Sequence, residues 1–238
     1  MPNARKALVV GAGIVGICTG IELRRRGCTV TLIDRLEPGH GRSFGNSGIL
    51  AAHAVVPIAL PGLLAQVPSM LLDREGPLVL RWGSLPHTWR WLLRLQRAAT
   101  LPQVQRAADA MKLLYRSTVE LHQTLAAEAG VPELVLAAPG LYVHRDPAGI
   151  ELADGMPQGL AWQLRRERGA QIEVLEGAAL REAEPELSTD YTRGVRMGPM
   201  GHTVNPLRLA EAYAAHDGPA HAHEQRGVGS SFFSLIVK

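Results

Sequence analysis

The sequence predicts an α/β fold with a parallel sheet, and three neighbouring features near its start support this. A continuous apolar run, residues 7–10, is typical of a strand buried on both faces, and Gly11 ends it. Apolar residues then recur at helical spacing as far as Ile21, and a second apolar run spans residues 29–33. A strand, a helix and a strand in this order predict a right-handed βαβ unit with parallel strands.

Composition, net charge and cysteine count exclude some classes of protein. The chain has 238 residues, of which 46% are hydrophobic and 20% charged, as in ordinary globular proteins. The formal net charge of +3 comes from 25 basic and 22 acidic residues, so we expect no nucleic-acid partner. Cys18 and Cys28 cannot form a disulfide framework, and we expect them to pack as small apolar residues in a reducing compartment.

The basic start, Arg5 and Lys6, followed by apolar residues, imitates a signal peptide. The regular glycines and the missing cleavage pattern argue against one. No other stretch reaches the roughly 18 apolar residues of a membrane span, so we expect no transmembrane helix. The main hypothesis is a cytoplasmic protein.

The first apolar run leads into a glycine motif, GxGxxG, formed by Gly11, Gly13 and Gly16. In such a motif the first glycine permits a tight turn, the second allows the backbone to approach a pyrophosphate, and the third allows close packing of helix and strand. The unpaired amides at the start of the helix then face the phosphate charge. The motif therefore indicates a Rossmann-like dinucleotide site.

An acidic residue completes this signal. Asp34 lies 18 positions beyond Gly16, at the end of the second strand, where a carboxylate accepts hydrogen bonds from an adenosine ribose. It argues against a ribose 2′-phosphate, although Arg35 beside it leaves that question open. NAD and FAD both contain an ADP half, so the glycine motif does not distinguish them. The long Gly/Ser/Asn loop at residues 37–48 favours the more extended cofactor, FAD.

Helices and short strands are expected beyond the loop. A region broken by prolines leads to a patch of tryptophans and arginines, for which we expect an amphipathic helix on the protein, with membrane-surface contact as the alternative. Residues 103–129 predict one long helix, because apolar positions alternate at spacings of three and four. The patch comprises Trp82, Trp89, Trp91, Arg81, Arg90, Arg94 and Arg97.

Taken in order, these motifs resemble a known family. The stretches VVGAGIVGICTGIELRRRGCTVTLID, GRSFGNSGIL, GLYVHRD, AEPEL and GHTVNPLRLAEAYA follow one another as in the FAD-dependent D-amino acid oxidase superfamily. Bacterial D-amino acid dehydrogenases of the small-subunit type are the most similar members, and the resemblance extends to about Ala215.

The resemblance implies an FAD enzyme that deaminates D-amino acids to 2-oxo acids by hydride transfer to the flavin. In the dehydrogenases the respiratory chain then reoxidises the flavin, which implies an acceptor there. Peripheral contact with the inner membrane is the alternative given above for the tryptophan and arginine patch. For the residues of the loop at 37–48, the alternative is a polar turn whose side chains hydrogen-bond to the backbone of the turn itself. The cofactor-binding residues implied are Gly11, Ala12, Gly13, Ile14, Val15, Gly16, Asp34 and Arg35, with Ser43, Asn46, Ser47 and Gly48 toward the flavin.

Five segments follow from this comparison. Family members are longer, and the tail of this chain departs from the family pattern. Its final apolar run has no later segment to pair with. We therefore expect a truncated chain that lacks the rest of a mixed-sheet substrate domain. The expected segments are an FAD-binding βαβ unit and flavin loop (1–52), a helical insertion (53–135), a partial substrate domain (136–200), a return to the FAD-binding domain (201–216) and an aberrant or truncated tail (217–238).

No catalytic residue is predicted, because hydride transfer from a neutral amine needs little beyond orientation. Tyr142 and Arg145 are the substrate-side candidates, against the alternative of a sheet tyrosine beside a surface arginine. No metal site is expected, and an inactive flavin-binding fragment, an NAD-linked dehydrogenase and an enzyme acting on glycine, sarcosine or another secondary amine remain alternatives. The histidines considered and set aside are His53, His202, His216, His221 and His223.

Overall fold

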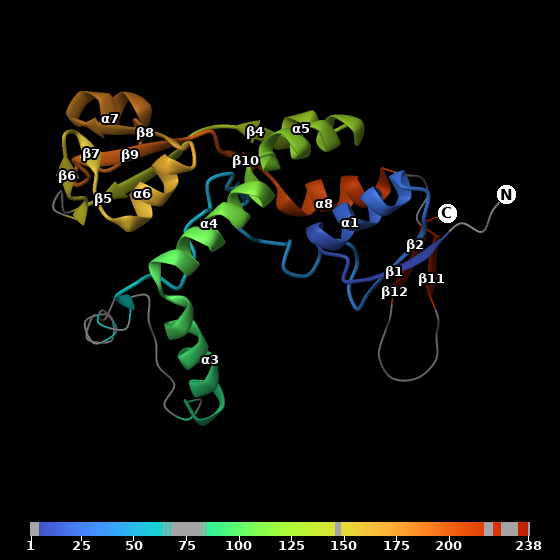
Figure 1. Cartoon of the computed structure of the whole chain (residues 1–238). Helices are drawn as coiled ribbons and strands as arrows, with labels where there is room; N and C mark the ends of the chain where they lie inside the picture. The colour runs from blue at the N-terminus through green and yellow to red at the C-terminus, as the bar shows by residue number, and fades with distance from the viewer. Residues whose placement is uncertain are drawn as a thin grey trace. The chain divides into compact units, whose positions relative to one another are not determined.

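A computed structural model describes residues 5–63, 65, 67, 83, 85–145, 149–216, 221–224 and 233–237 (Figure 1). The chain divides into two compact units. The first unit comprises residues 1–51, 117–138 and 200–238, and the second comprises residues 52–116 and 139–199.

The first unit contains the predicted βαβ element. β1 (Lys6–Val10) and β2 (Thr29–Asp34) pair in parallel, and α1 (Ile14–Arg25) connects them. The sheet continues with β12 (Phe233–Val237), which is antiparallel to β2, and β11 (His221–Glu224). The final apolar run is β12, and both of its partners, β2 and β11, precede it in the chain.

Three helices of the first unit share one apolar core. α1, α5 and α8 contribute to it together with β1 and β2, and Figure 1 shows α1 and α8 side by side. A second, antiparallel sheet has the order β3-β10-β4. The remaining elements of this unit are β3 (Ile49–Leu50), α5 (Thr118–Glu128), the 3-10 helix η2 (Pro132–Leu134), β4 (Val135–Ala137), β10 (Gly201–Thr203) and α8 (Pro206–Ala215).

β1 is buried on one face, not on both as its apolar run predicts. Ala7 and Val9 pack against the core, whereas Leu8 is 62% and Val10 81% exposed. Side chains alternate along a strand, so Ala7 and Val9 share the face that packs against the core, and Leu8 and Val10 share the other face. A continuous apolar run does not reveal how many faces are covered.

The second unit is built around an antiparallel sheet of order β5-β9-β8. Val104 and Ala108 of α4 pack on Leu164 of α6 in a separate core. The predicted α/β class is confirmed, with the parallel pair in the first unit. The elements are α3 (Leu85–Ala98), α4 (Leu101–Tyr115), β5 (Gly140–His144), β6 (Leu152–Ala153), β7 (Met156–Pro157), α6 (Leu160–Glu167), β8 (Gln171–Glu176), α7 (Gly177–Ala183) and β9 (Arg193–Gly198).

The single helix predicted over residues 103–129 is wrong, because the structure contains two helices. α4 ends at Tyr115 and α5 begins at Thr118. Ala108 of α4 is buried in the core of the second unit, and Ala126 of α5 in that of the first. The apolar spacing continues across the break, and no glycine or proline marks it.

Within the part of the chain that the structure describes, no helix has the length and apolarity needed to cross a bilayer.

Candidate functional site

The turn between β1 and α1 has the geometry that its glycines predict. Gly11 has a φ of +108°, which L side chains rarely adopt, and its amide donates to the Ile33 carbonyl at 2.7 Å. A Cβ on Gly16 would lie 1.8 Å from the Gly11 carbonyl oxygen. Gly11 therefore makes the turn possible, and Gly16 allows the helix to approach the strand.

The first turn of α1 is capped from a distant loop. Gly13 is the N-cap residue and has no side chain to serve as a cap. Instead, the Ile14 amide donates to the Ser43 hydroxyl oxygen at 2.8 Å, and Ser43 is buried. A Cβ on Gly13 would lie 3.3 Å from this oxygen, so the glycine gives the serine room to reach the helix.

Four amides at this end of α1 have no acceptor within the helix, and Ser43 serves that of Ile14. The Ile17 amide makes the first intrahelical hydrogen bond, to the Gly13 carbonyl at 3.0 Å. Helix geometry leaves the amides of Gly13, Val15 and Gly16 without an intrahelical acceptor. No acidic residue of α1 lies in this first turn, so the helix itself supplies no negative charge to the positive end of its dipole. The arrangement suits a pyrophosphate.

Asp34 adjoins this turn and holds its backbone. One carboxylate oxygen, Oδ2, accepts from the Ala12 amide at 2.7 Å. The other, Oδ1, accepts from the amides of Arg35 at 2.6 Å and Leu36 at 3.2 Å. The Ala12 amide is the main cause that lowers the pKa of Asp34 below its usual value, so the carboxylate is ionised at neutral pH. It brings a negative charge next to the glycine turn, as a ribose-binding acid requires.

The predicted flavin loop is organised by Asn46. Its side-chain oxygen accepts from the Gly48 amide at 2.8 Å, and its Nδ2 donates to the Ser43 carbonyl at 3.1 Å. Gly48 has a φ of +67°, and its carbonyl accepts from the Thr203 amide at 2.8 Å. Ser47 is exposed. The loop thus satisfies its own backbone through Asn46 and is anchored to β10, while Ser47 stays available to a ligand.

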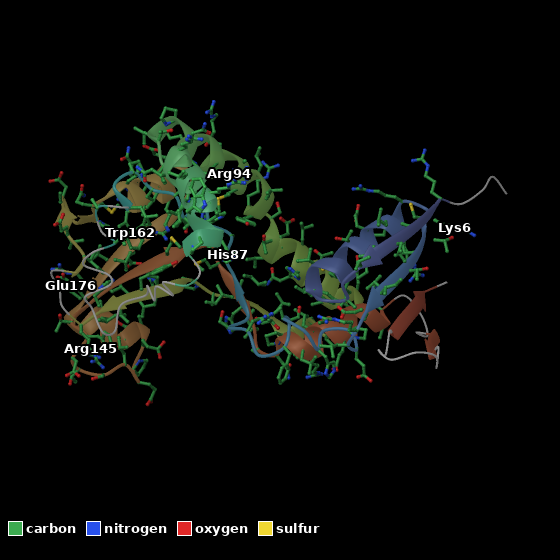
Figure 2. The ribbon with its side chains drawn as sticks, turned by 90° about the horizontal axis from the view of Figure 1, so that it is seen from below. Lys6, His87, Arg94, Arg145, Trp162 and Glu176 are labelled. Carbon is green, nitrogen blue, oxygen red and sulfur yellow. The ribbon has the colours of Figure 1, made fainter. Side chains whose placement is uncertain are left out.

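The two substrate-side candidates of the second unit have separate partners. Tyr142 on β5 packs edge-to-face on Trp162 at 5.5 Å between ring centroids, and the Arg165 guanidinium lies 5.6 Å from the Tyr142 ring. Arg145, just beyond β5, lies over the Tyr191 ring at 5.7 Å. The structure therefore places Tyr142 and Arg145 in two different aromatic clusters. Figure 2 labels Trp162 and Arg145 in this unit.

The histidines set aside on sequence grounds have diverse surroundings. His53 has a buried Nε2 without a hydrogen-bond partner among the described residues, and burial, aided by Lys112, lowers its pKa. His216 lies 3.8 Å from Glu128, and His202 lies on β10. Among the described residues, no group of three or more His, Cys, Asp and Glu side chains is placed to hold a metal ion.

Sequence reasoning missed a stacked pair in the first unit. The His122 and Tyr213 rings lie 5.8 Å apart with an interplanar angle of 12°, and the Tyr213 hydroxyl donates to the His122 carbonyl at 2.9 Å. The two residues are 91 positions apart, so no local pattern predicts the contact. His122 also lines a groove of about 440 Å³ between α1 and α5, beside Cys18. Burial raises the pKa of the Cys18 thiol to about 11, consistent with a packing role.

Two curated proteins are similar to this chain over most of its length. D-amino-acid oxidase of Bradyrhizobium diazoefficiens is 37% identical over 91% of this chain and 51% of its own length. D-amino acid dehydrogenase of Rhodopseudomonas palustris is 30% identical over 81% of this chain and 45% of its own length. The chain thus spans about half the length of these relatives.

A solved structure shows the same fold. Glycine oxidase from Bacillus cereus matches 90% of this chain and 43% of its own with a TM-score of 0.50 and 16% identity. The model of the DAO family, FAD dependent oxidoreductase, matches residues 6–227. The chain belongs to the DAO family of FAD-dependent oxidoreductases.

Proposed function

We propose that this chain binds FAD and forms part of an enzyme that oxidatively deaminates D-amino acids. The observation that carries the proposal is the glycine turn, where three unpaired helix amides adjoin an ionised carboxylate, Asp34. Amides suit a pyrophosphate and a carboxylate suits ribose hydroxyls, so both halves of an adenosine diphosphate have matching partners.

The residues present fit the cofactor that the family name implies. In the proposal the amides of Gly13, Val15 and Gly16 bind the pyrophosphate, and Gly11 keeps the turn open. Asp34 accepts from the ribose. Ala12 and Ile14 hold the turn through Asp34 and Ser43, as their hydrogen bonds support.

The flavin side of the site is assigned to the loop. Ser47 contacts the cofactor directly, while Ser43, Asn46 and Gly48 keep the loop in position, a division that their hydrogen bonds and burial support. Arg35, exposed beside Asp34, is placed near the adenosine end. When bound, FAD supplies a two-electron acceptor for oxidation of an amine substrate.

The substrate assignment is supported by the names of the two curated relatives, D-amino-acid oxidase and D-amino acid dehydrogenase. We assign Tyr142 and Arg145 to the substrate side, since a guanidinium pairs with a carboxylate. An acceptor of the respiratory chain then takes the electrons, which places the protein in the cytoplasm and in peripheral contact with the inner membrane.

Titration with FAD tests the cofactor assignment. We expect flavin absorbance to co-purify with the chain and the thermal midpoint to rise, because a ligand at 100 times its Kd stabilises the folded state by about 2.7 kcal/mol. Asp34→Asn keeps the shape of the side chain but removes its charge, and it should weaken FAD binding about tenfold or more. NADH should have no comparable effect. A response to NADH but not to FAD would reject the assignment.

Turnover is tested separately with D-alanine and an artificial electron acceptor. A flavin-binding chain without turnover is the second candidate, and the observation that favours it is the coverage of about half of each relative. Production of pyruvate from D-alanine would exclude it. Glycine and sarcosine in the same assay test the alternative substrates.

A further inference from the structure

α3 presents a surface that no part of the proposed FAD site uses. Three arginines, Arg90, Arg94 and Arg97, follow one another at helical spacings of four and three and therefore share one face of the helix. All three side chains are exposed. Arg90 is flanked in the sequence by Trp89 and Trp91, which lie one on each side of the arginine face. Their side chains are 48% and 57% exposed. We call these five residues the α3 surface.

The opposite face of α3 is less exposed. Thr88, Leu92 and Leu95 recur at the same spacings and are only partly exposed. The three arginines therefore lie on the other side of the helix from Leu92 and Leu95. Figure 2 shows α3 with His87 and Arg94 labelled.

The positive charge of this surface is not neutralised locally. Residues 76–108 contain five arginines and no aspartate or glutamate, against a formal net charge of +3 for the whole chain. Arg90 lies over the Trp89 ring at 5.5 Å. Within the described residues, no carboxylate forms an ion pair with Arg90, Arg94 or Arg97. Arg81 and Trp82, which belong to the predicted patch, lie outside the described residues.

We propose that the α3 surface docks on an anionic phospholipid bilayer. Guanidinium groups pair with lipid phosphates, and indole rings flanking them lie at the depth of the headgroups, where tryptophan is favoured. A nucleic acid would also meet the arginines, but the small net charge of the chain gives no wider basic surface to follow its backbone. This inference deepens the membrane contact proposed above and rests on it, and it names the surface and the lipid chemistry.

Sedimentation with vesicles tests the proposal. The vesicles are phosphatidylcholine alone and phosphatidylcholine mixed about 7:3 with phosphatidylglycerol. We expect the chain to bind the anionic vesicles at least tenfold more tightly than the neutral ones, and added salt to reverse the binding by screening. Each measurement is made with and without FAD. Vesicle binding without flavin binding would reject the cofactor assignment alone, and the reverse would reject this inference alone.

Two triple variants of equal net charge distinguish binding through the α3 surface from a general electrostatic attraction between the chain and the vesicles. Arg90→Gln with Arg94→Gln and Arg97→Gln should reduce vesicle binding about tenfold or more. The control of equal charge changes Arg26, Arg196 and Arg208 to Gln; these lie outside α3, their side chains are 71%, 42% and 57% exposed, and each is paired with a glutamate. It lowers the net charge equally and should leave most of the binding intact. Equal loss in both variants would overturn the proposal.

Tryptophan fluorescence gives a second readout. Emission should shift to the blue on anionic vesicles, and the shift should disappear in the double variant Trp89→Phe with Trp91→Phe but remain in Trp162→Phe. The thermal midpoints of the two α3 variants should match the unmodified chain, since the residues changed in α3 are exposed. Absence of the shift, tighter binding to a single-stranded oligonucleotide, or burial of both tryptophans in a dimer of this chain would each overturn the lipid assignment.

Discussion

The glycine turn of the first unit and the β5 strand of the second unit differ in how their candidate residues are held. In the glycine turn, backbone atoms determine the geometry. Gly16 leaves no room for a side chain, and Asp34 accepts three backbone amides. In the second unit, side chains determine the geometry, because the Trp162 ring and the Arg165 guanidinium both contact the Tyr142 ring. A site built from backbone is specified by a short motif, whereas a site built from side chains depends on distant partners.

Gly16→Ala should have the largest effect, since it puts a Cβ against the backbone of the same turn. Helix and strand must separate, and we expect a loss of about 3 kcal/mol in the free energy of unfolding together with loss of FAD binding. Urea unfolding and FAD titration measure both. The control is Gly41→Ala, where the Cβ meets nothing within 4 Å. If Gly16→Ala resembled this control, the close approach of helix and strand would not matter.

Gly48→Ala tests the anchor of the flavin loop against a matched glycine. Gly45 and Gly48 share a φ of +67°, so alanine is equally strained at both. At Gly45 the Cβ meets nothing within 4 Å, whereas at Gly48 it lies 2.4 Å from the Thr203 carbonyl oxygen. We expect Gly48→Ala to destabilise by about 2 kcal/mol more than Gly45→Ala in urea unfolding. Equal effects would mean that the loop moves away from β10 at little cost.

Acidification should weaken the first unit through His122. Burial lowers the pKa of this imidazole in the folded state below its unfolded value of about 6.5. The unfolded chain therefore binds the proton more readily, so stability is retained above that value and falls as the pH decreases toward the folded pKa.

The variant His122→Gln isolates this contribution. Thermal midpoints from neutral pH to about pH 5 should fall more steeply in the unmodified chain than in the variant. Parallel curves for the two proteins would show that the His122 and Tyr213 pair does not titrate with folding.

Tyr142→Phe should have the smallest effect on stability, because the ring keeps its contact with Trp162. We expect a change within about 0.5 kcal/mol. If the hydroxyl binds substrate, KM for D-alanine should rise by about threefold to tenfold while kcat is retained. Tyr191→Phe is the control in the neighbouring cluster. Unchanged KM in Tyr142→Phe would remove Tyr142 from the substrate side.

The sequence by itself determined the parallel βαβ unit, the glycine turn and the position of Asp34. These features depend on contacts within one short segment, where steric limits on Gly11 and Gly16 leave few alternatives. It also indicated the exposed helix that carries Trp89 and Trp91, because helical spacing alone separates its faces.

Only the tertiary structure decided which faces of a strand are buried, where a helix ends and which distant residues meet. The apolar runs did not show that Leu8 and Val10 lie on an open face of β1, or that one periodic stretch divides into α4 and α5. Nor did they show that Ser43 caps α1 from 29 residues away, or that His122 meets Tyr213. Each of these depends on which distant segment arrives as a neighbour, and periodicity records the direction of a side chain but not its partner.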